Sequence, residues 1–144
     1  MNSNGIRQGQ GGFTLLEIMV VIVILGLLVS IVAPNILQNQ DRAMVEKARA
    51  DIAVLEQALD MYKLDNHVYP TTDQGLDALV NKPTSAPEPR NYRSDGYIKR
   101  LPQDPWGNPY QYLQPGEHGP YDLYSTGADG DEGGEGLASD IGNW

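Results

Sequence analysis

The first hydrophobic pattern along the chain is one long apolar segment, residues 13–33. Only four positions in it are not large or aliphatic: Thr14, Glu17, Gly26 and Ser30. At about 1.5 Å of rise per helical residue, such a segment spans roughly 30 Å, the thickness of a bilayer hydrocarbon core. The pattern therefore predicts a membrane-spanning helix.

A second pattern follows, in which apolar residues recur at steps of four and three. These residues are Ala48, Ile52, Leu55, Leu59 and Tyr62. The spacing places them on one face of a helix that runs from about residue 41 to residue 64. We expect this apolar stripe to pack on the chain's own domain. The charged residues expected to keep the other face in water are Asp51, Glu56, Asp60 and Lys63.

Pro34 lies between the two patterns. Proline removes one backbone donor, and it can bend or locally unwind a helix; Gly26 would loosen the segment further. We therefore predict one long but interrupted helix from Phe13 to Leu64, about 75 Å long if fully helical.

The chain changes character after Asn66, because nine of its ten prolines lie beyond that residue. Residues 75–80 are predicted to form one short helix, capped by Thr71 or Thr72 and ended by the Lys82-Pro83 pair. Long helices cannot continue through the remainder.

Short strands are the other predicted elements of this region. Three aromatic-rich runs bounded by Gly and Pro, residues 96–99, 110–113 and 121–124, predict a small antiparallel sheet. Residues 82–90 predict an extended polar linker. The fold class is therefore α+β, with the sheet covering the apolar stripe of the long helix.

Residues 104–109 are dense in turn-forming residues and contain one large aromatic, Trp106. Such a segment is more often a turn that packs its indole on the core than a ligand site. We predict the structural role.

Length and charge limit the possible functions. The chain has 144 residues and a formal net charge of −9, which leaves room for one small domain beyond the membrane segment and argues against nucleic acid as a partner. The polar residues 1–12 lack an apolar core and are not an ordinary secretory signal. Arg7 and the initial amine precede the apolar run, which favours a cytoplasmic amino terminus and a periplasmic domain. There is no cysteine, so no disulfide can stabilise that domain.

No catalytic constellation is recognisable. The chain lacks Cys, and its two histidines, His67 and His118, are far apart in sequence. A nucleophile, a base and an orienting residue are not found together. We predict that the protein is not an enzyme.

The region after Arg100 contains eight acidic residues and no Lys or Arg. Its glycine-rich part, residues 126–140, offers oxygen ligands of the kind that Ca²⁺ prefers. An EF-hand beginning at Asp129 does not fit, since Gly133 stands at position five and Asp140 at position twelve. From the residues alone, a solvated acidic loop and a calcium site remain equally open.

Glu17 is the one charge within the membrane segment. A charge there costs on the order of 2 to 3 kcal/mol, so it normally has a partner. One reading is a signal anchor with a stray acid at the interface. The other is that Glu17 meets a positive group on another subunit.

The run Gly12-Phe13-Thr14-Leu15-Leu16-Glu17, behind a short polar leader, resembles the class III signal of type IV pilins and type II secretion pseudopilins. The resemblance implies that a membrane aspartyl peptidase, the prepilin peptidase, cuts between Gly12 and Phe13, and that the new terminal Phe13 is N-methylated. The mature chain would then carry a net charge of −10, because the full chain has a net charge of −9 and the leader takes Arg7 with it. It also implies that Glu17 pairs with the amine of Phe13 on a neighbouring subunit.

Further motifs make the chain similar to the major pseudopilins of type II secretion. They are residues 58–66, Tyr69-Pro70-Thr71-Thr72, residues 101–107 with Asp-Pro-Trp-Gly, and the ending Asp-Ile-Gly-Asn-Trp at 140–144. The resemblance implies a pilin-like fold and a homopolymeric filament subunit that works with minor pseudopilins and an inner-membrane assembly platform to export folded proteins. The alternatives are a surface pilin for adhesion, motility or DNA uptake, and a membrane-anchored periplasmic binding module or enzyme that never polymerises.

The same resemblance implies a structural calcium site in the acidic loop. Its ligands map onto Asp129, Asp140 and the backbone carbonyl of Thr126. Relatives often have a second aspartate where this chain has the neutral Ser139, so Glu135 is the alternative ligand. The predicted organisation is a leader at 1–12, an assembly helix at 13–33, its amphipathic continuation at 34–65, and a periplasmic region at 66–144 with the acidic loop 126–140.

Overall fold

The computed structural model describes residues 11–144. The chain divides into two compact units, residues 1–39 and residues 40–144. The predictions that concern Arg7 and the rest of residues 1–10 lie outside the described residues.

One helix, α1 (Leu15–Asn66), contains both hydrophobic patterns except Phe13 and Thr14, so it begins two residues after the predicted start and ends two residues after the predicted end. It continues without a break through Pro34, so the predicted interruption is wrong. Proline deprives a helix of one hydrogen bond, which can bend the helix without ending it, and here the helix continues beyond Pro34.

The carboxyl end of α1 is fixed by two residues. The Asn66 side chain donates to the carbonyl oxygen of Tyr62 at 3.1 Å, and the backbone N–H of His67 donates to the Lys63 carbonyl at 2.7 Å. His67 has a positive φ of 66°, the left-handed conformation that commonly ends a helix. The chain therefore leaves the helix directly after Asn66.

Three short strands form one antiparallel sheet in the order β1-β2-β3. They are β1 (Gln111–Leu113), β2 (Asp122–Ser125) and β3 (Ile141–Gly142). In the register, Tyr112 faces Leu123 and Tyr124 faces Gly142. Two strands lie within a residue of the predicted runs, whereas β3 was missed because two residues carry no strand pattern.

The predicted strand at residues 96–99 is wrong. The N–H groups of Tyr97 and Ile98 both donate to the carbonyl oxygen of Leu79, at 2.7 and 3.2 Å. Gly96, with φ 72°, lies so close to the backbone of Leu79 and Val80 that a Cβ would overlap it. The segment is thus held at the end of the short helix and cannot pair with the sheet.

The short helix is the 3₁₀ helix η1 (Leu76–Leu79). Its N-cap residue is Gly75, and no side chain caps it, so the predicted cap by Thr71 or Thr72 is wrong. Thr72 instead exchanges hydrogen bonds with the backbone of Gln114, at 2.9 and 3.0 Å. The hydroxyl therefore joins the helix-following loop to the end of β1.

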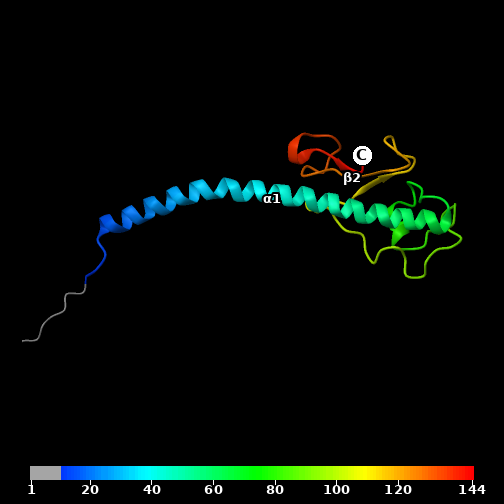
Figure 1. The fold of residues 1–144 in the computed structure, drawn as a ribbon, viewed down its shortest axis with the longest axis horizontal. Coiled ribbons are helices and arrows are strands. Elements are labelled where there is room, and N and C mark those ends of the chain that lie inside the picture. The colour runs from blue at the N-terminus through cyan, green and yellow to red at the C-terminus, as the bar shows by residue number, and fades with distance from the viewer. Residues whose placement is uncertain (1–10) are drawn as a thin grey trace, which may run out of the picture. The chain divides into compact units, whose positions relative to one another are not determined.

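The core lies between α1 and the sheet, and Figure 1 shows β2 alongside the second half of the helix. All five residues of the predicted stripe are buried, each at most 3% exposed. Four of them, all except Ala48, form one core cluster with residues of η1 and the strands such as Leu79, Tyr112 and Leu123. Two of the charged residues, Asp51 and Glu56, are only half-exposed, because they border the stripe.

The turn at residues 104–109 forms around Asp104, whose Oδ1 accepts hydrogen bonds from the N–H groups of Trp106 and Asn108 at 3.1 and 2.7 Å. The Trp106 side chain is half-buried and lies outside the core cluster. The predicted packing of the indole on the main core is therefore wrong. It is the carboxylate of this turn that is buried.

Candidate functional site

The amino end of α1 begins with a side-chain N-cap. Thr14 precedes the helix, and its hydroxyl accepts a hydrogen bond from the N–H of Glu17 at 3.1 Å. The cap was missed from the sequence, although the Thr-x-x-Glu spacing is a known signature of a helix start. Glu17 thus lies in the first turn of α1, where the helix dipole favours negative charge.

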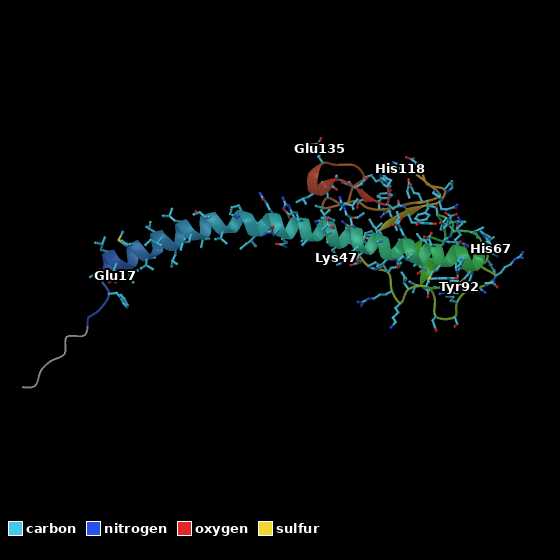
Figure 2. All side chains as sticks on the ribbon, viewed as in Figure 1. Glu17, Lys47, His67, Tyr92, His118 and Glu135 are labelled. Carbon is cyan, nitrogen blue, oxygen red and sulfur yellow. The ribbon has the colours of Figure 1, made fainter. Side chains whose placement is uncertain are left out.

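The Glu17 carboxylate has no ion-pair partner within residues 11–144, and its side chain is exposed at the start of the helix (Figure 2). The large apolar side chains that follow it, from Ile18 to Leu37, are also exposed, by 43–66%. α1 is the one described helix long and apolar enough to cross a membrane, by length and composition. The segment therefore offers an acid and an apolar surface to something outside the chain.

The loop between β2 and β3 closes on itself at Gly127. The N–H of Ala128 donates to the carbonyl oxygen of Leu137 at 2.9 Å. Gly127 has φ 70°, and a Cβ at this position would lie 2.8 Å from the carbonyl oxygens of Leu137 and Ser139. Glycine is required here because the two limbs of the loop touch through backbone atoms.

The five predicted calcium ligands all lie in this loop. They are Thr126, Asp129, Glu135, Ser139 and Asp140. Gly127 brings the limb that holds the first two against the limb that holds the last two. Glu135 precedes the 3₁₀ helix η2 (Gly136–Ala138), which belongs to the second limb.

The structure distinguishes among these side chains. The hydroxyl of Ser139 donates to the Gly136 carbonyl at 2.8 Å, which engages its proton within the loop. Glu135 is exposed and points away from the ribbon in Figure 2. Asp129 accepts a hydrogen bond from the N–H of Asp131 at 3.1 Å. Glu135 is thus the least well placed of the predicted ligands.

Asp140 holds an unsatisfied oxygen. Its Oδ2 accepts from the Gly133 N–H at 3.0 Å, whereas Oδ1 is buried and has no hydrogen-bond partner among residues 11–144. A buried carboxylate oxygen without a partner is costly, and a hard cation is a suitable partner for it. No three His, Asp or Glu side chains converge within residues 11–144, so backbone carbonyls such as that of Thr126 would complete the set. The donors present fit a hard, oxygen-seeking cation on this basis.

One further acid of the loop is tied to the sheet. The hydroxyl of Tyr124 donates to Glu132 Oε1 at 2.6 Å. That hydrogen bond, with burial, raises the pKa of Tyr124 to about 12. Glu132 is therefore engaged as an anchor of the loop on β2.

The Ile-Gly-Asn-Trp ending has a structural explanation. Asn143 continues the pairing with β2, because its Oδ1 accepts from the Leu123 N–H and its own N–H donates to the Leu123 carbonyl, both at 3.0 Å. The Trp144 ring crosses Gly142 so closely that any Cβ there would overlap it. It then stacks on His118, with ring centroids 4.0 Å apart and planes at 5°.

The buried carboxylate of Asp122 makes the domain sensitive to pH. Burial acts to raise its pKa, but hydrogen bonds donated by the Glu117 N–H and by the ring and N–H of His118 outweigh burial and lower the pKa below its ordinary value. A carboxyl with a lowered folded pKa stabilises the fold above its unfolded pKa, near 3.9, and loses that contribution as pH falls through the folded pKa.

We expect Asp122→Asn to lower the melting temperature at pH 7, and we expect this difference from wild type to shrink as the pH falls below the unfolded pKa and through the lowered folded pKa of Asp122. Circular dichroism at a series of pH values measures it. Glu88→Gln, at an exposed position, is the matched control and should behave like wild type. An Asp122→Asn difference that stays constant across the series would contradict the assignment.

Family models match both halves of the chain. The model described as type II secretion system (T2SS), protein G matches residues 35–144, well over half of the chain. The chain belongs to the type II secretion protein G family. The model described as the prokaryotic N-terminal methylation motif matches residues 7–33, the segment that contains Gly12, Phe13 and Glu17.

Individual members of the protein G family are similar over nearly the whole chain. The type II secretion system core protein G of Vibrio cholerae is 69% identical over 135 residues, which cover 94% of this chain and 92% of that protein. The corresponding protein of Pseudomonas aeruginosa is 61% identical over 138 residues, 96% of this chain and 97% of that protein.

A solved structure gives the same assignment. The crystal structure of the major pseudopilin from the type 2 secretion system of enterohaemorrhagic Escherichia coli superposes with a TM-score of 0.70 at 58% identity, and the match covers 77% of this chain and 95% of that one. The fold, a long helix against a small antiparallel sheet, is thus the pseudopilin fold. These relatives support the pseudopilin reading and not the surface-pilin alternative, and the family is one of structural subunits.

Proposed function

We propose that this protein G family member is the major subunit of a type II secretion pseudopilus, a helical periplasmic filament that drives folded proteins across the outer membrane. The observation that carries the proposal is the protein G match over residues 35–144, joined to a helix whose amino half exposes apolar side chains. That half has a single acid, Glu17, between residues 13 and 33.

Processing between Gly12 and Phe13 by the prepilin peptidase, with N-methylation of Phe13, is the first step of the proposed pathway. The methylation-motif match over residues 7–33 supports it. Residues 11–14 precede the helix, so the proposed scissile bond lies outside the hydrogen-bonded turns of α1.

Glu17 then supplies the recognition of an incoming subunit. Its carboxylate has no cationic partner within residues 11–144, while cleavage creates an amine at Phe13. An ammonium and a carboxylate that meet in a low-dielectric surrounding offset each other's desolvation, and either one alone is penalised. The pair therefore favours the correct register of neighbouring subunits.

The proposed location is the bacterial inner membrane and then the periplasmic pseudopilus. The chain would cross once, with a cytoplasmic amino terminus and a periplasmic carboxyl-terminal domain, consistent with the apolar amino half of α1. In the filament, the apolar helices would pack on one another, which replaces lipid by another apolar surrounding. The proposed partners are other copies of the chain, minor pseudopilins and the inner-membrane assembly platform; nucleic acid is not among them at a net charge of −9.

We expect Glu17→Ala to reduce filament formation at least tenfold, while the protein still accumulates in the membrane fraction. Removing one partner of a buried ion pair typically costs about 3–5 kcal/mol, and each 1.4 kcal/mol corresponds to a factor of ten. Cross-linking of subunits in cells that lack their own copy measures assembly.

Ser30→Ala is the matched control for Glu17→Ala. Ser30 is the other hydrogen-bonding side chain well inside the apolar segment, and its hydroxyl donates to its own helix, at the Leu27 carbonyl, at 2.7 Å. This variant should assemble normally. Normal filaments from a stable, inserted Glu17→Ala protein would rule out the assembly mechanism and favour an anchored module.

We further propose that the acidic loop binds a structural Ca²⁺ through the Thr126 carbonyl, Asp129 and Asp140, with Ser139 or Glu135 as additional ligands. The buried, unpartnered Oδ1 of Asp140 supports this, as does the closeness of the two limbs at Gly127. A bound Ca²⁺ would neutralise the loop's mutual repulsion and join its limbs, in a domain that has no disulfide.

Calcium is expected to raise the melting temperature of the domain by about 10 °C or more. A ligand at about 100 times its Kd stabilises the folded state by roughly 2.7 kcal/mol, and each kcal/mol shifts Tm by about 4–8 °C in a domain of this size. Circular dichroism with calcium and then with chelator measures it. The shift should vanish in Asp129→Ala and Asp140→Ala and persist in Glu88→Ala; a wild type without any shift would leave only a solvated acidic loop.

A further inference from the structure

The turn at residues 104–108 holds a buried carboxylate whose two oxygens both accept hydrogen bonds. Asp104 is 4% exposed. Its Oδ1 accepts from the N–H groups of Trp106 and Asn108, and its Oδ2 accepts from the hydroxyl of Ser125 at 2.6 Å. A carboxylate with this many donors is a rigid group, because each donor fixes one of its lone pairs.

The hydroxyl of Ser125 passes this constraint to the acidic loop. Ser125 is the last residue of β2 and is fully buried. While its Oγ donates to Asp104, the same oxygen accepts a hydrogen bond from the N–H of Gly127 at 3.1 Å. The carboxylate of the turn is therefore linked through one hydroxyl to the backbone at which the loop closes.

A second connection runs from the same turn. The side-chain Nδ2 of Asn108 approaches the carbonyl oxygen of Gly127 at 3.5 Å. The Asn108 amide also lies against Gly130, where a Cβ would approach its Nδ2 to 3.3 Å. Both polar groups of the Gly127 backbone are thus directed toward the turn, its N–H through Ser125 and its carbonyl through Asn108.

Gly127 is the position at which such a constraint affects both limbs. It lies between Thr126 and Asp129 on one limb and contacts the Leu137 and Ser139 carbonyls, next to Asp140, on the other. A shift of its backbone therefore moves the oxygen donors of both limbs together. Groups that hold metal ligands in place typically change metal affinity by about 10–100-fold when removed.

We propose that Ser125 and Asn108, held by the buried Asp104, are positioning residues that set the calcium affinity of the acidic loop by fixing the Gly127 backbone. This inference rests on the calcium site of the proposed function. None of the three residues is assigned as a ligand, and they act through the backbone of the loop.

Calorimetric titration of calcium into the full chain in detergent micelles tests the inference. Ser125→Ala is expected to raise the Kd for calcium at least tenfold, and Asn108→Ala about threefold or more. The melting temperature is measured in chelator for every variant, so that affinity and stability are compared separately.

Leu79→Ala is the control for a structural effect alone. Leu79 is fully buried against the far part of the helix core, in η1, so this variant should lower the calcium-free melting temperature and keep the wild-type Kd. If Ser125→Ala does not fold, Asn108→Ala decides the question.

The outcomes separate the two proposals. A wild type that binds no calcium overturns the metal site and this inference with it. A wild type that binds, with Ser125→Ala and Asn108→Ala binding equally well, overturns this inference alone. A Leu79→Ala variant that loses affinity in parallel with its stability also overturns it, because affinity would then follow global stability rather than these hydrogen bonds.

Discussion

Replacing Leu59 with Ala will lower the free energy of unfolding of the domain at residues 40–144 by about 2–5 kcal/mol, the usual range for a fully buried leucine. Leu59 is 0% exposed and belongs to the core cluster with Leu79 and Leu123. Its truncation removes packed atoms and leaves a cavity between α1 and the sheet. Trp106 and Trp144 both lie in this domain, so their fluorescence during urea unfolding of the full chain in detergent reports the change.

Leu64→Ala provides the same chemical change on the exposed face of the same helix. Leu64 is 74% exposed, and leucine and alanine have similar helix propensities. We expect a change within about 0.5 kcal/mol. Equal effects of the two substitutions would mean that the apolar stripe does not hold the sheet on the helix.

Gly127→Ala is the second substitution expected to have a large effect. It should lower the free energy of unfolding by at least about 2 kcal/mol. For a residue with a Cβ, the left-handed conformation costs about 1–2 kcal/mol, and φ 70° requires that conformation. In addition, that Cβ would lie 2.8 Å from the carbonyl oxygens of Leu137 and Ser139, so the limbs of the loop must separate. The melting temperature without calcium measures the loss, and calorimetry should show calcium binding weakened or abolished.

Gly136→Ala is the control that separates the backbone strain at a positive φ from the steric overlap with the other limb that Gly127→Ala would add. Gly136 has φ 62°, yet nothing lies within 4 Å of the position that a Cβ would take there. Gly136→Ala should therefore lower the free energy of unfolding only by the cost of the left-handed conformation, about 1–2 kcal/mol. If Gly127→Ala is no more destabilising than Gly136→Ala, the contact between the limbs does not contribute to stability.

The helix and its buried face were predictable because apolar residues recur along the sequence at the spacing of helical turns. The stripe from Ala48 to Tyr62 requires only a spacing of three and four, and each of its residues is buried. The error at residues 96–99 has the opposite origin. Those residues have strand-like composition, but the Leu79 carbonyl takes the N–H groups of Tyr97 and Ile98, and no local pattern contains that distant partner.

In the candidate site too, contacts between residues close in sequence could be predicted, and contacts between distant residues could not. The hydrogen bond between Thr14 and Glu17 is local, so the Thr-x-x-Glu spacing could have revealed it, although it was missed. The link from Asp104 to Ser125 joins residues 21 apart in sequence, and the need for glycine at 127 depends on carbonyls that return from residues 137 and 139. Sequence reasoning finds the acids of a loop, but the hydrogen bonds that shape it depend on the completed fold.

The cap at Thr14 bears on the proposed cleavage between Gly12 and Phe13. A peptide bond inside a helix must first be unwound before an enzyme can take hold of its backbone, with the loss of several cooperative hydrogen bonds. Thr14 stops α1 from extending toward the amino terminus, so residues 11–14 remain non-helical. In the proposed processing, the bond between Gly12 and Phe13 would then be available to the peptidase while the helix behind it stays intact, and cleavage would not disturb the segment proposed to assemble afterwards.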